Sequence, residues 1–144
     1  MLSVAQFIST LTCVLFAGAA IYINLVEHPA RMSASTEIAA TVWAPSYKRA
    51  TVMQAPLAAI SSIAAVLAWA LGGAVWWLIG AIVIFSVIPF TLLVIKPTNK
   101  QLLVPDRNLS SAETRILLER WGKLHAVRSL ISVFASVIFL ALLT

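Results

Sequence analysis

The distribution of charged residues restricts the fold of this chain more than any other feature. Residues 1–26, 50–95 and 129–144 contain no Asp, Glu, Lys or Arg. Such stretches are typical of transmembrane helices, because about 20 apolar residues cross the hydrocarbon core of a bilayer. The central stretch is long enough for two crossings, and the pair Gly72-Gly73 divides it. We therefore expect four membrane-spanning segments.

The predicted fold is all-α, a membrane four-helix bundle that forms a single domain over residues 1–144. Helices satisfy their own backbone groups in lipid, whereas four strands cannot close a barrel. The predicted helices cover about residues 2–26, 45–71, 74–95 and 122–143, with an amphipathic extension at about 111–121. Ser110 followed by Glu113 predicts a capping box at the start of that extension.

Prolines mark the predicted helix ends. Pro29 is expected to end the first helix and Pro97 the third, whereas Pro45 suits the first turn of the second. Pro56 and Pro89 fall inside the spans, and each is predicted to kink its helix.

The charges also predict how the bundle is oriented. All ten Lys and Arg residues, all five acidic residues and both histidines fall in or beside two long loops, residues 28–44 and 96–121. The Gly72-Gly73 turn and both chain ends carry none. By the positive-inside rule, we expect an integral, multi-pass protein with these loops on the cytoplasmic side and both ends on the other side. The net charge of +5 is therefore read as a topology signal, and no nucleic-acid partner is expected.

Several polar residues are predicted to lie near the cytoplasmic ends of the first three helices. Asn24, Glu27 and Arg31 are three and four residues apart, so they share one face if the first helix continues through Pro29. Gln54 lies in the second predicted helix and is a candidate for binding a ligand.

The fourth helix carries the most informative polar stripe. Trp121, His125 and Arg128 are four and three residues apart and therefore lie above one another on one face. An arginine at a membrane boundary either extends to the headgroups or faces an interior partner. For Arg128 that partner would be Glu27, and the spacing leaves both readings open.

His28, His125 and Glu27 match in type the two-histidine, one-carboxylate set of non-haem iron sites. However, Glu27 and His28 are adjacent, and neighbours on a regular helix diverge by about 100°. We therefore predict no metal or other cofactor, and we keep iron at these three residues as an alternative.

Four short motifs resemble a known family. They are Glu27-His28-Pro29, Pro89-Phe90-Thr91, the run Lys96-Pro97-Thr98-Asn99 followed by Leu102, and the arrangement Trp121, His125, Arg128. Over nearly the whole chain the sequence resembles a family of small four-helix membrane proteins that includes the fungal anthrone oxygenases. The resemblance implies oxidation of an anthrone, a tricyclic polyketide, to an anthraquinone with dioxygen and without a conventional cofactor.

The residues of the motifs fit that chemistry. An anthrone is activated by removing a proton from its central methylene carbon, so we expect His125 to act as the base and Arg128 to stabilise the enolate oxygen. Trp121 would stack on the rings. Glu27 would orient His125 or Arg128. The remaining candidates for contact with the substrate, a hydrophobic aromatic molecule, are Asn99, Gln54 and His28.

A second reading is a non-catalytic accessory subunit of a larger membrane complex. Small side chains permit close contacts either within the bundle or with a partner, which includes a second copy in a homo-oligomer. They are Ala17, Gly18, Ala64, Ala65 and Ala68. In this reading Trp121 anchors the helix at the membrane interface and Arg128 extends to the headgroups.

Overall fold

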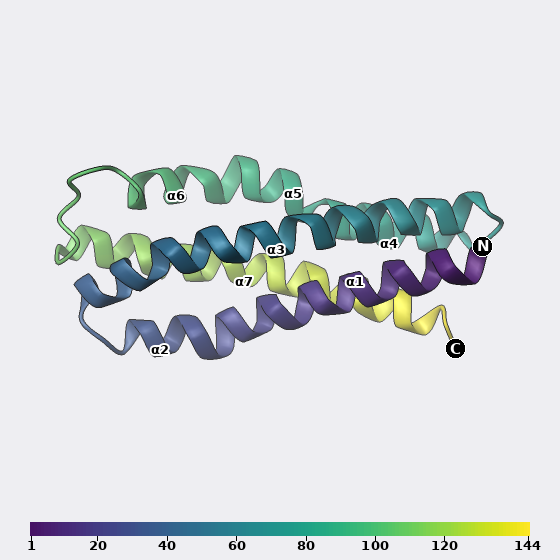
Figure 1. Cartoon of the computed structure of the whole chain (residues 1–144), viewed down its shortest axis with the longest axis horizontal. Coiled ribbons are helices and arrows are strands. Elements are labelled where there is room, and N and C mark those ends of the chain that lie inside the picture. The colour runs from purple at the N-terminus through teal and green to yellow at the C-terminus, as the bar shows by residue number, and fades with distance from the viewer.

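The computed structural model describes residues 1–144 and confirms that the chain is all-helical. Four helical rods run along the long axis of the molecule, with both chain ends at the same end of the bundle (Figure 1). The opposite end, called here the loop end, holds the connections from the first rod to the second and from the third to the fourth (Figure 1).

Two of the rods are composite. The first consists of α1 (Leu2–Tyr22), the π-helical turn η1 (Ile23–Glu27) and α2 (His28–Met32). The second is α3 (Thr36–Ala70). The third consists of α4 (Val75–Phe85), α5 (Val87–Phe90), the π-helical turn η2 (Thr91–Ile95) and α6 (Lys96–Leu102). The fourth is α7 (Ala112–Ala141).

The prediction that Pro29 and Pro97 end their helices is wrong. A π-helical turn precedes each proline, with the His28 N–H bonded to the Ile23 carbonyl and the Lys96 N–H to the Thr91 carbonyl, five residues back. In a regular α-helix the proline ring clashes with the carbonyl four residues before it, and the wider π turn relieves that crowding. The first and third rods therefore extend to the loop end.

The second helix also begins earlier than predicted. Residues 36–44, expected within the loop 28–44, belong to α3, and only residues 33–35 separate α2 from α3. The Ser35 side chain caps α3 by accepting a hydrogen bond from the Ile38 N–H at 3.4 Å, and Glu37 places a negative charge in the first turn. These two start signals outweigh Pro45, which lies inside the helix.

The predicted kink at Pro89 is confirmed as a break in the third rod. α4 ends at Phe85, the residue whose carbonyl Pro89 is unable to bond, and Ser86 separates it from α5. The Ser86 hydroxyl donates to the Val83 carbonyl at 2.7 Å and so adds a side-chain hydrogen bond at the break. α3, by contrast, has no break at Pro56.

The predicted extension 111–121 and the fourth helix form one continuous rod. The cap differs from the prediction, because Ser111 and not Ser110 accepts a hydrogen bond from the Thr114 N–H, at 3.1 Å. The Ser110 hydroxyl instead donates to Glu37 at 3.3 Å and ties the long loop to the start of α3.

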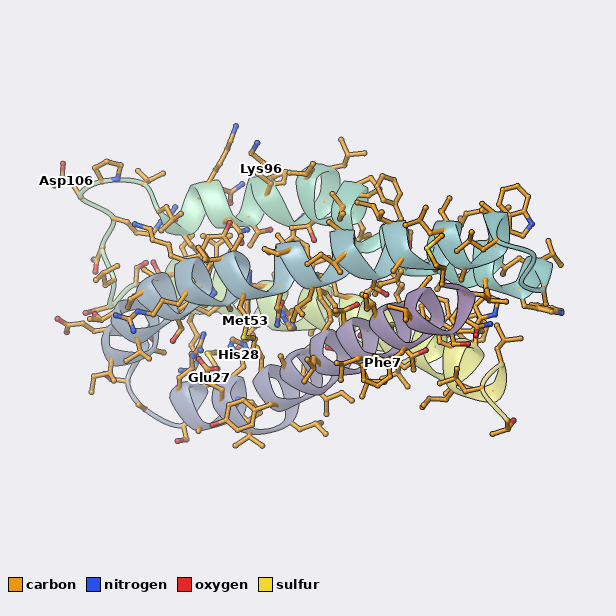
Figure 2. All side chains as sticks on the ribbon, turned by 45° about the vertical axis from the view of Figure 1, so that its right-hand side comes forward. Phe7, Glu27, His28, Met53, Lys96 and Asp106 are labelled. Atoms are coloured by element: carbon orange, nitrogen blue, oxygen red, sulfur yellow. The ribbon has the colours of Figure 1, made fainter.

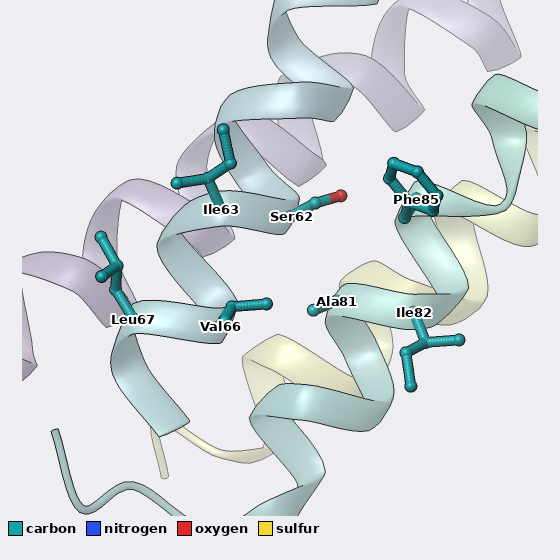
Figure 3. A pocket seen from close by; sticks show the side chains of 7 residues that line it. All are labelled: Ser62, Ile63, Val66, Leu67, Ala81, Ile82 and Phe85. Carbon is teal, nitrogen blue, oxygen red and sulfur yellow. The ribbon is translucent and has the colours of Figure 1, made fainter. Parts of the chain in front are cut away.

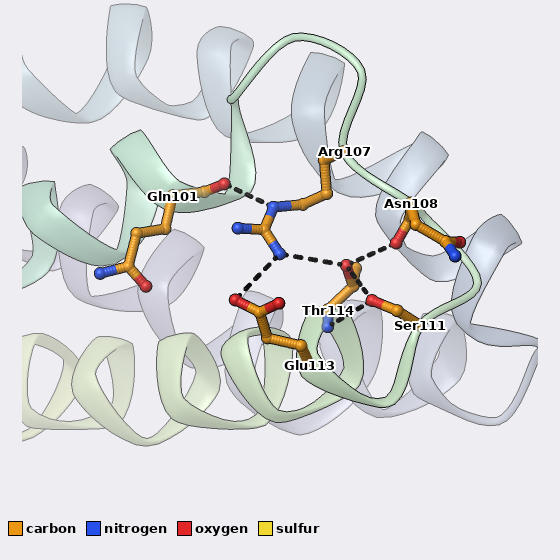
Figure 4. Close-up of polar contacts among 6 residues, drawn as sticks. All are labelled: Gln101, Arg107, Asn108, Ser111, Glu113 and Thr114. Atoms are coloured by element: carbon orange, nitrogen blue, oxygen red, sulfur yellow. Dashed lines mark hydrogen bonds and ion pairs between the residues drawn. The ribbon is translucent and has the colours of Figure 1, made fainter.

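Arg107 closes the loop between α6 and α7 (Figure 4). Its Nε donates to the Gln101 carbonyl at 2.7 Å, and its Nη1 lies 3.5 Å from the Glu113 carboxylate. The Thr114 hydroxyl donates to the Asn108 carbonyl at 2.9 Å. These bonds fix the direction in which α7 enters the bundle.

Small side chains permit close packing in the half of the bundle near the chain ends. Ser9 and Ser61 each donate to the other's carbonyl, at 3.0 and 2.9 Å, which locks α1 against α3. Gly80 packs against the Phe139 ring, since an added Cβ would lie 2.3 Å from it. Four of the five small residues considered for partner contacts are buried inside the bundle, namely Ala17, Ala64, Ala65 and Ala68.

All four rods are long and apolar enough to cross a membrane. Their outward surface carries large exposed apolar side chains such as Phe7, Leu25 and Leu130. Water does not solvate such a surface well, whereas lipid does, so this surface suits a multi-pass membrane protein.

Cysteine labelling tests the predicted orientation. Ala74 is exposed in the turn between α3 and α4, whereas Gly72 has φ +97° and Gly73 has no room for a Cβ. We expect Ala74→Cys to react with a membrane-impermeant maleimide on intact cells, and Lys100→Cys to react only after permeabilisation. The parent chain is the control, because Cys13 is buried. The reverse pattern would invert the proposed orientation.

Candidate functional site

Polar residues from three rods meet in one small cavity toward the loop end. The lining residues come from η1, α2, α3 and α7: Ile23, Glu27, Arg31, Ser46, Tyr47, Ala50, Thr51, Gln54, Trp121, His125 and Arg128. The cavity measures about 20 Å³, which holds about one water molecule. Glu27 and His28 lie beside one another on the first rod, whereas Lys96 and Asp106 project away from the bundle (Figure 2).

Asn24 connects the first and fourth rods at this cavity. Its Nδ2 donates to the Gly122 carbonyl at 3.1 Å, which fixes the direction of the amide. Its Oδ1 lies 2.7 Å from His125 Nδ1 and accepts a hydrogen bond from the Ser129 hydroxyl at 2.6 Å. Both polar atoms of the Asn24 amide are thus hydrogen-bonded, and its oxygen faces His125.

These contacts assign the tautomer of His125. An amide oxygen only accepts hydrogen bonds, so Nδ1 of the neutral ring must carry the proton and Nε2 must carry the lone pair. Nε2 makes no hydrogen bond within the protein, and His125 lines the cavity. The lone pair of Nε2 is therefore free to accept a hydrogen bond or a proton from a ligand in the cavity.

Trp121 forms an aromatic wall between the two histidines. Its ring centroid lies 4.9 Å from that of His125 and 5.2 Å from that of His28. Trp43 packs edge-on against Trp121 at 5.8 Å, and Tyr47 stacks on Trp43 at 5.1 Å. These rings restrict the motion of Trp121 and keep its position relative to His125.

Two guanidinium groups line the cavity. Arg31 pairs with Glu27 one turn earlier, whereas Arg128 donates to the neutral Gln54 side chain at 3.0 Å and lies over the Phe16 ring. The alternative in which Glu27 pairs with Arg128 is therefore wrong: after η1, Glu27 lies against Arg31 on the same rod. Arg128 has no carboxylate partner.

Several nitrogen atoms at the cavity are buried without a hydrogen-bond partner. They are Arg31 Nε and Nη1, Arg128 Nε, Gln54 Nε2 and Trp121 Nε1. The Gln54 side chain is 1% exposed, and a buried donor without an acceptor is energetically costly. All five atoms are donors, which is the pattern expected at a site for an oxygen-bearing or anionic ligand.

Five of the seven residues proposed from the sequence line the cavity together: Glu27, Gln54, Trp121, His125 and Arg128. His28 lies behind Trp121 and against Gly122, outside the lining. Asn99 on α6 is buried, but it does not reach the cavity, and both polar atoms of its side chain lack a partner. The functional roles of all seven residues stay predictions.

The sequence analysis did not identify Tyr47 and Ser129 as site residues. Ser129 follows His125 by four residues and therefore lies on the same stripe of α7, which is the only signal that would have pointed to it. Tyr47 lies in the predicted helix 45–71, seven residues before Gln54 and therefore on the same face, and this spacing is the signal that would have pointed to it.

The structure contains no group of three or more His, Cys, Asp or Glu side chains placed to hold a metal ion. His125 Nδ1 is bonded to Asn24, and Glu27 is bonded to Arg31. Two of the three residues of the iron alternative, His125 and Glu27, are thus directed to other partners.

Comparison with known proteins gives one family and one relative. The family model described as anthrone oxygenase matches residues 43–138. Over 64 residues the chain is 45% identical to anthrone oxygenase tpcL of Aspergillus fumigatus, a stretch that covers 42% of this chain and 40% of that protein. The chain thus matches less than half the length of that relative. No solved structure matches the chain.

Gly122 allows His28 to pack close to the fourth helix. A substitution of Gly122 therefore tests how tightly the side chains of the site are packed. An added Cβ would lie 2.5 Å from His28 Nε2, in a region held by the Trp121 ring. We expect Gly122→Ala to lower the free energy of unfolding in detergent by about 1–3 kcal/mol, the usual effect of overpacking.

The matched control is Gly18→Ala, since no atom lies within 4 Å of the added Cβ. That substitution should leave thermal stability unchanged or raise it slightly, because Ala favours a helix over Gly. Equal effects of the two substitutions would contradict the packing described here.

Proposed function

The chain belongs to the anthrone oxygenase family, and we propose that it oxidises a flat, hydrophobic anthrone-type aromatic molecule with dioxygen at the cavity around His125. The observation that carries the proposal is the pairing of His125 Nδ1 with Asn24, which leaves Nε2 free beside Arg128. The match covers 40% of the relative, so the activity in its name supports the proposal for this chain by similarity alone.

The proposed reaction needs a base and an acceptor of electrons. His125 Nε2 takes a proton from the central methylene carbon, and the enolate that forms adds to dioxygen to give a peroxide anion. Protonated His125 returns its proton to the peroxide, and loss of water leaves the new carbonyl. One anthrone and one O₂ thus give one anthraquinone and one H₂O, with dioxygen as the four-electron acceptor. No cofactor takes part in the proposed scheme.

Arg128 stabilises the negative charge that develops on the enolate oxygen. A fixed cation is most effective where water is excluded, and a cavity with room for about one water molecule meets that condition. Trp121 packs against the His125 ring and holds it in place at the cavity. Glu27 acts indirectly, by holding Arg31 in place.

The proposed site lies on the cytoplasmic side of the membrane. It belongs to the half of the bundle that carries the charged residues, and the positive-inside rule assigns that half to the cytoplasm.

The accessory-subunit alternative has less support. It requires small residues that face lipid and an Arg128 without a partner, but Ala17, Ala64, Ala65 and Ala68 pack inside the bundle. Gly18 alone faces outward, and Arg128 bonds to Gln54. Co-purification of a stoichiometric membrane partner with a chain that shows no oxygen uptake would favour the subunit.

Oxygen uptake by the purified protein with emodin anthrone tests the proposal. We expect a rate above spontaneous oxidation that falls at least about tenfold in His125→Ala, because general bases contribute about 10² to 10⁴ in rate. The matched control is His28→Ala, which removes a histidine outside the cavity lining and should retain a larger share of the rate. A His125→Ala variant that folds and keeps full activity would remove His125 from the mechanism.

Asn24 is proposed to position His125 and to select its tautomer. We expect Asn24→Leu to lower kcat with little change in KM, because the substrate does not contact Asn24 while the base loses its orientation. Asn24→Asp keeps an acceptor for Nδ1 and should recover part of kcat. Equal kcat values in Asn24→Leu and the parent chain would contradict this role.

A further inference from the structure

The cavity is too small for the ligand that the proposed function requires. At about 20 Å³ it admits one oxygen-sized group, whereas pockets that bury small organic ligands usually measure about 300–1,000 Å³. The rings of a tricyclic molecule must therefore lie in an adjoining space. Two surface grooves share walls with the cavity, one on each side of α3.

The larger of these grooves lies between the end of the first rod and α3. It measures about 380 Å³ and shares Ile23, Glu27, Ser46 and Ala50 with the cavity. The wide π turn η1 forms part of its wall, and such turns are common at functional sites. Most of the remaining lining is apolar or aromatic, including Tyr22. This groove is large enough for three fused rings and opens toward lipid.

The second groove lies between α3 and the segment α5–η2. It measures about 120 Å³ and shares only Thr51 and Arg128 with the cavity. This volume is below the range for organic ligands. We therefore assign the rings to the groove beside η1.

The charges around the cavity indicate which part of the ligand enters it. Two guanidinium groups face one carboxylate, and Arg128 has only a neutral partner. Buried charges are normally paired, and the free N–H groups of Arg31, Arg128 and Gln54 are all donors. A single ionised oxygen meets both needs, because it accepts hydrogen bonds and neutralises the extra positive charge.

We propose that the groove between η1 and α3 binds the rings of a flat, acidic aromatic molecule that enters from the bilayer, with one ionised oxygen held between Arg31 and Arg128. This inference rests on the proposed function and adds the ring-binding groove and Arg31 to it. The ligand class is a fused-ring phenol or enol that is ionised when bound.

The other half of the bundle holds two large grooves, and both lack these features. The groove of about 440 Å³ between α1 and α3 is lined only by apolar side chains. The other lies between α3 and α4, measures about 420 Å³ and is lined by apolar side chains and Ser62 (Figure 3). The Ser62 hydroxyl is already used, donating to the Ala58 carbonyl at 2.9 Å. This surface suits lipid chains and offers nothing to an ionised oxygen.

Binding of emodin, an anthraquinone that the proposed reaction does not oxidise further, tests the inference without any need for turnover. Calorimetric titration would use the protein in lipid nanodiscs, with empty nanodiscs as the blank, at mildly alkaline pH where emodin is ionised. We expect Ala50→Trp, which fills the junction of groove and cavity, to weaken binding at least about tenfold. Ala55→Trp is the matched control in the other groove and should leave binding unchanged.

Two further comparisons test whether an ionised oxygen of the ligand binds to the guanidinium groups. Arg31→Gln should weaken binding of emodin, and the trimethyl ether of emodin, which has no ionisable hydroxyl, should bind the parent chain at least about tenfold more weakly than emodin. Equal affinities of emodin and its ether would overturn the role of the guanidinium groups.

Three results of the titration would overturn the proposed position of the ligand rings in the groove beside η1. They are no binding of emodin to the parent chain, full affinity in Ala50→Trp, or a loss confined to Ala55→Trp. Thermal unfolding checks that each variant folds, and Met53→Trp, in the same groove and half exposed, replaces Ala50→Trp if that variant does not. Oxygen uptake is scored separately, so groove-dependent binding without turnover would defeat only the proposed function.

Discussion

The hydrogen bonds of the Asn24 amide connect the first rod to the fourth, and the geometry of the cavity depends on them. Nδ2 binds the Gly122 carbonyl, while Oδ1 receives the hydrogen bonds of His125 and Ser129. In a low-dielectric interior each of these bonds is stronger than in water, and an unmade bond is costly. One side chain therefore sets the distance between the rods, the rotation of α7 and the nitrogen that His125 presents to the cavity.

Because the bundle is apolar and lies in a membrane, the cluster of polar side chains at the cavity is evidence for a function. Polar groups are expensive within an apolar bundle, and Arg31, Arg128 and Gln54 retain free donors at a cavity with room for about one water molecule. The half of the bundle near the chain ends is packed with alanines and paired serines and contains none of the buried polar atoms that lack a partner. The concentration of unmet donors at the end of three rods is what separates a binding site from a bundle held together by packing alone.

Much of this fold could be predicted from the sequence, because charge-free stretches and glycine turns are local signals. The stripe of Trp121, His125 and Arg128 was equally accessible, since helical spacing alone places these residues on one face. The spacing of Glu27 and Arg31 predicts their pairing once the first helix continues through Pro29. The π turn that lets the helix continue has no signal in the residue pattern. Asn99 shows the same limit: the rotation of α6 after η2 buries it away from the cavity.

The tautomer of His125 is the most direct test of the account, and an NMR spectrum of its ring nitrogens would measure it. The protein would carry isotope-labelled histidine in detergent micelles, and a His28→Gln variant would separate the two signals. We expect a proton on Nδ1, an unprotonated Nε2, and loss of this preference in Asn24→Leu. A proton on Nε2 in the parent chain would contradict the account, because His125 would then have no free base facing the cavity.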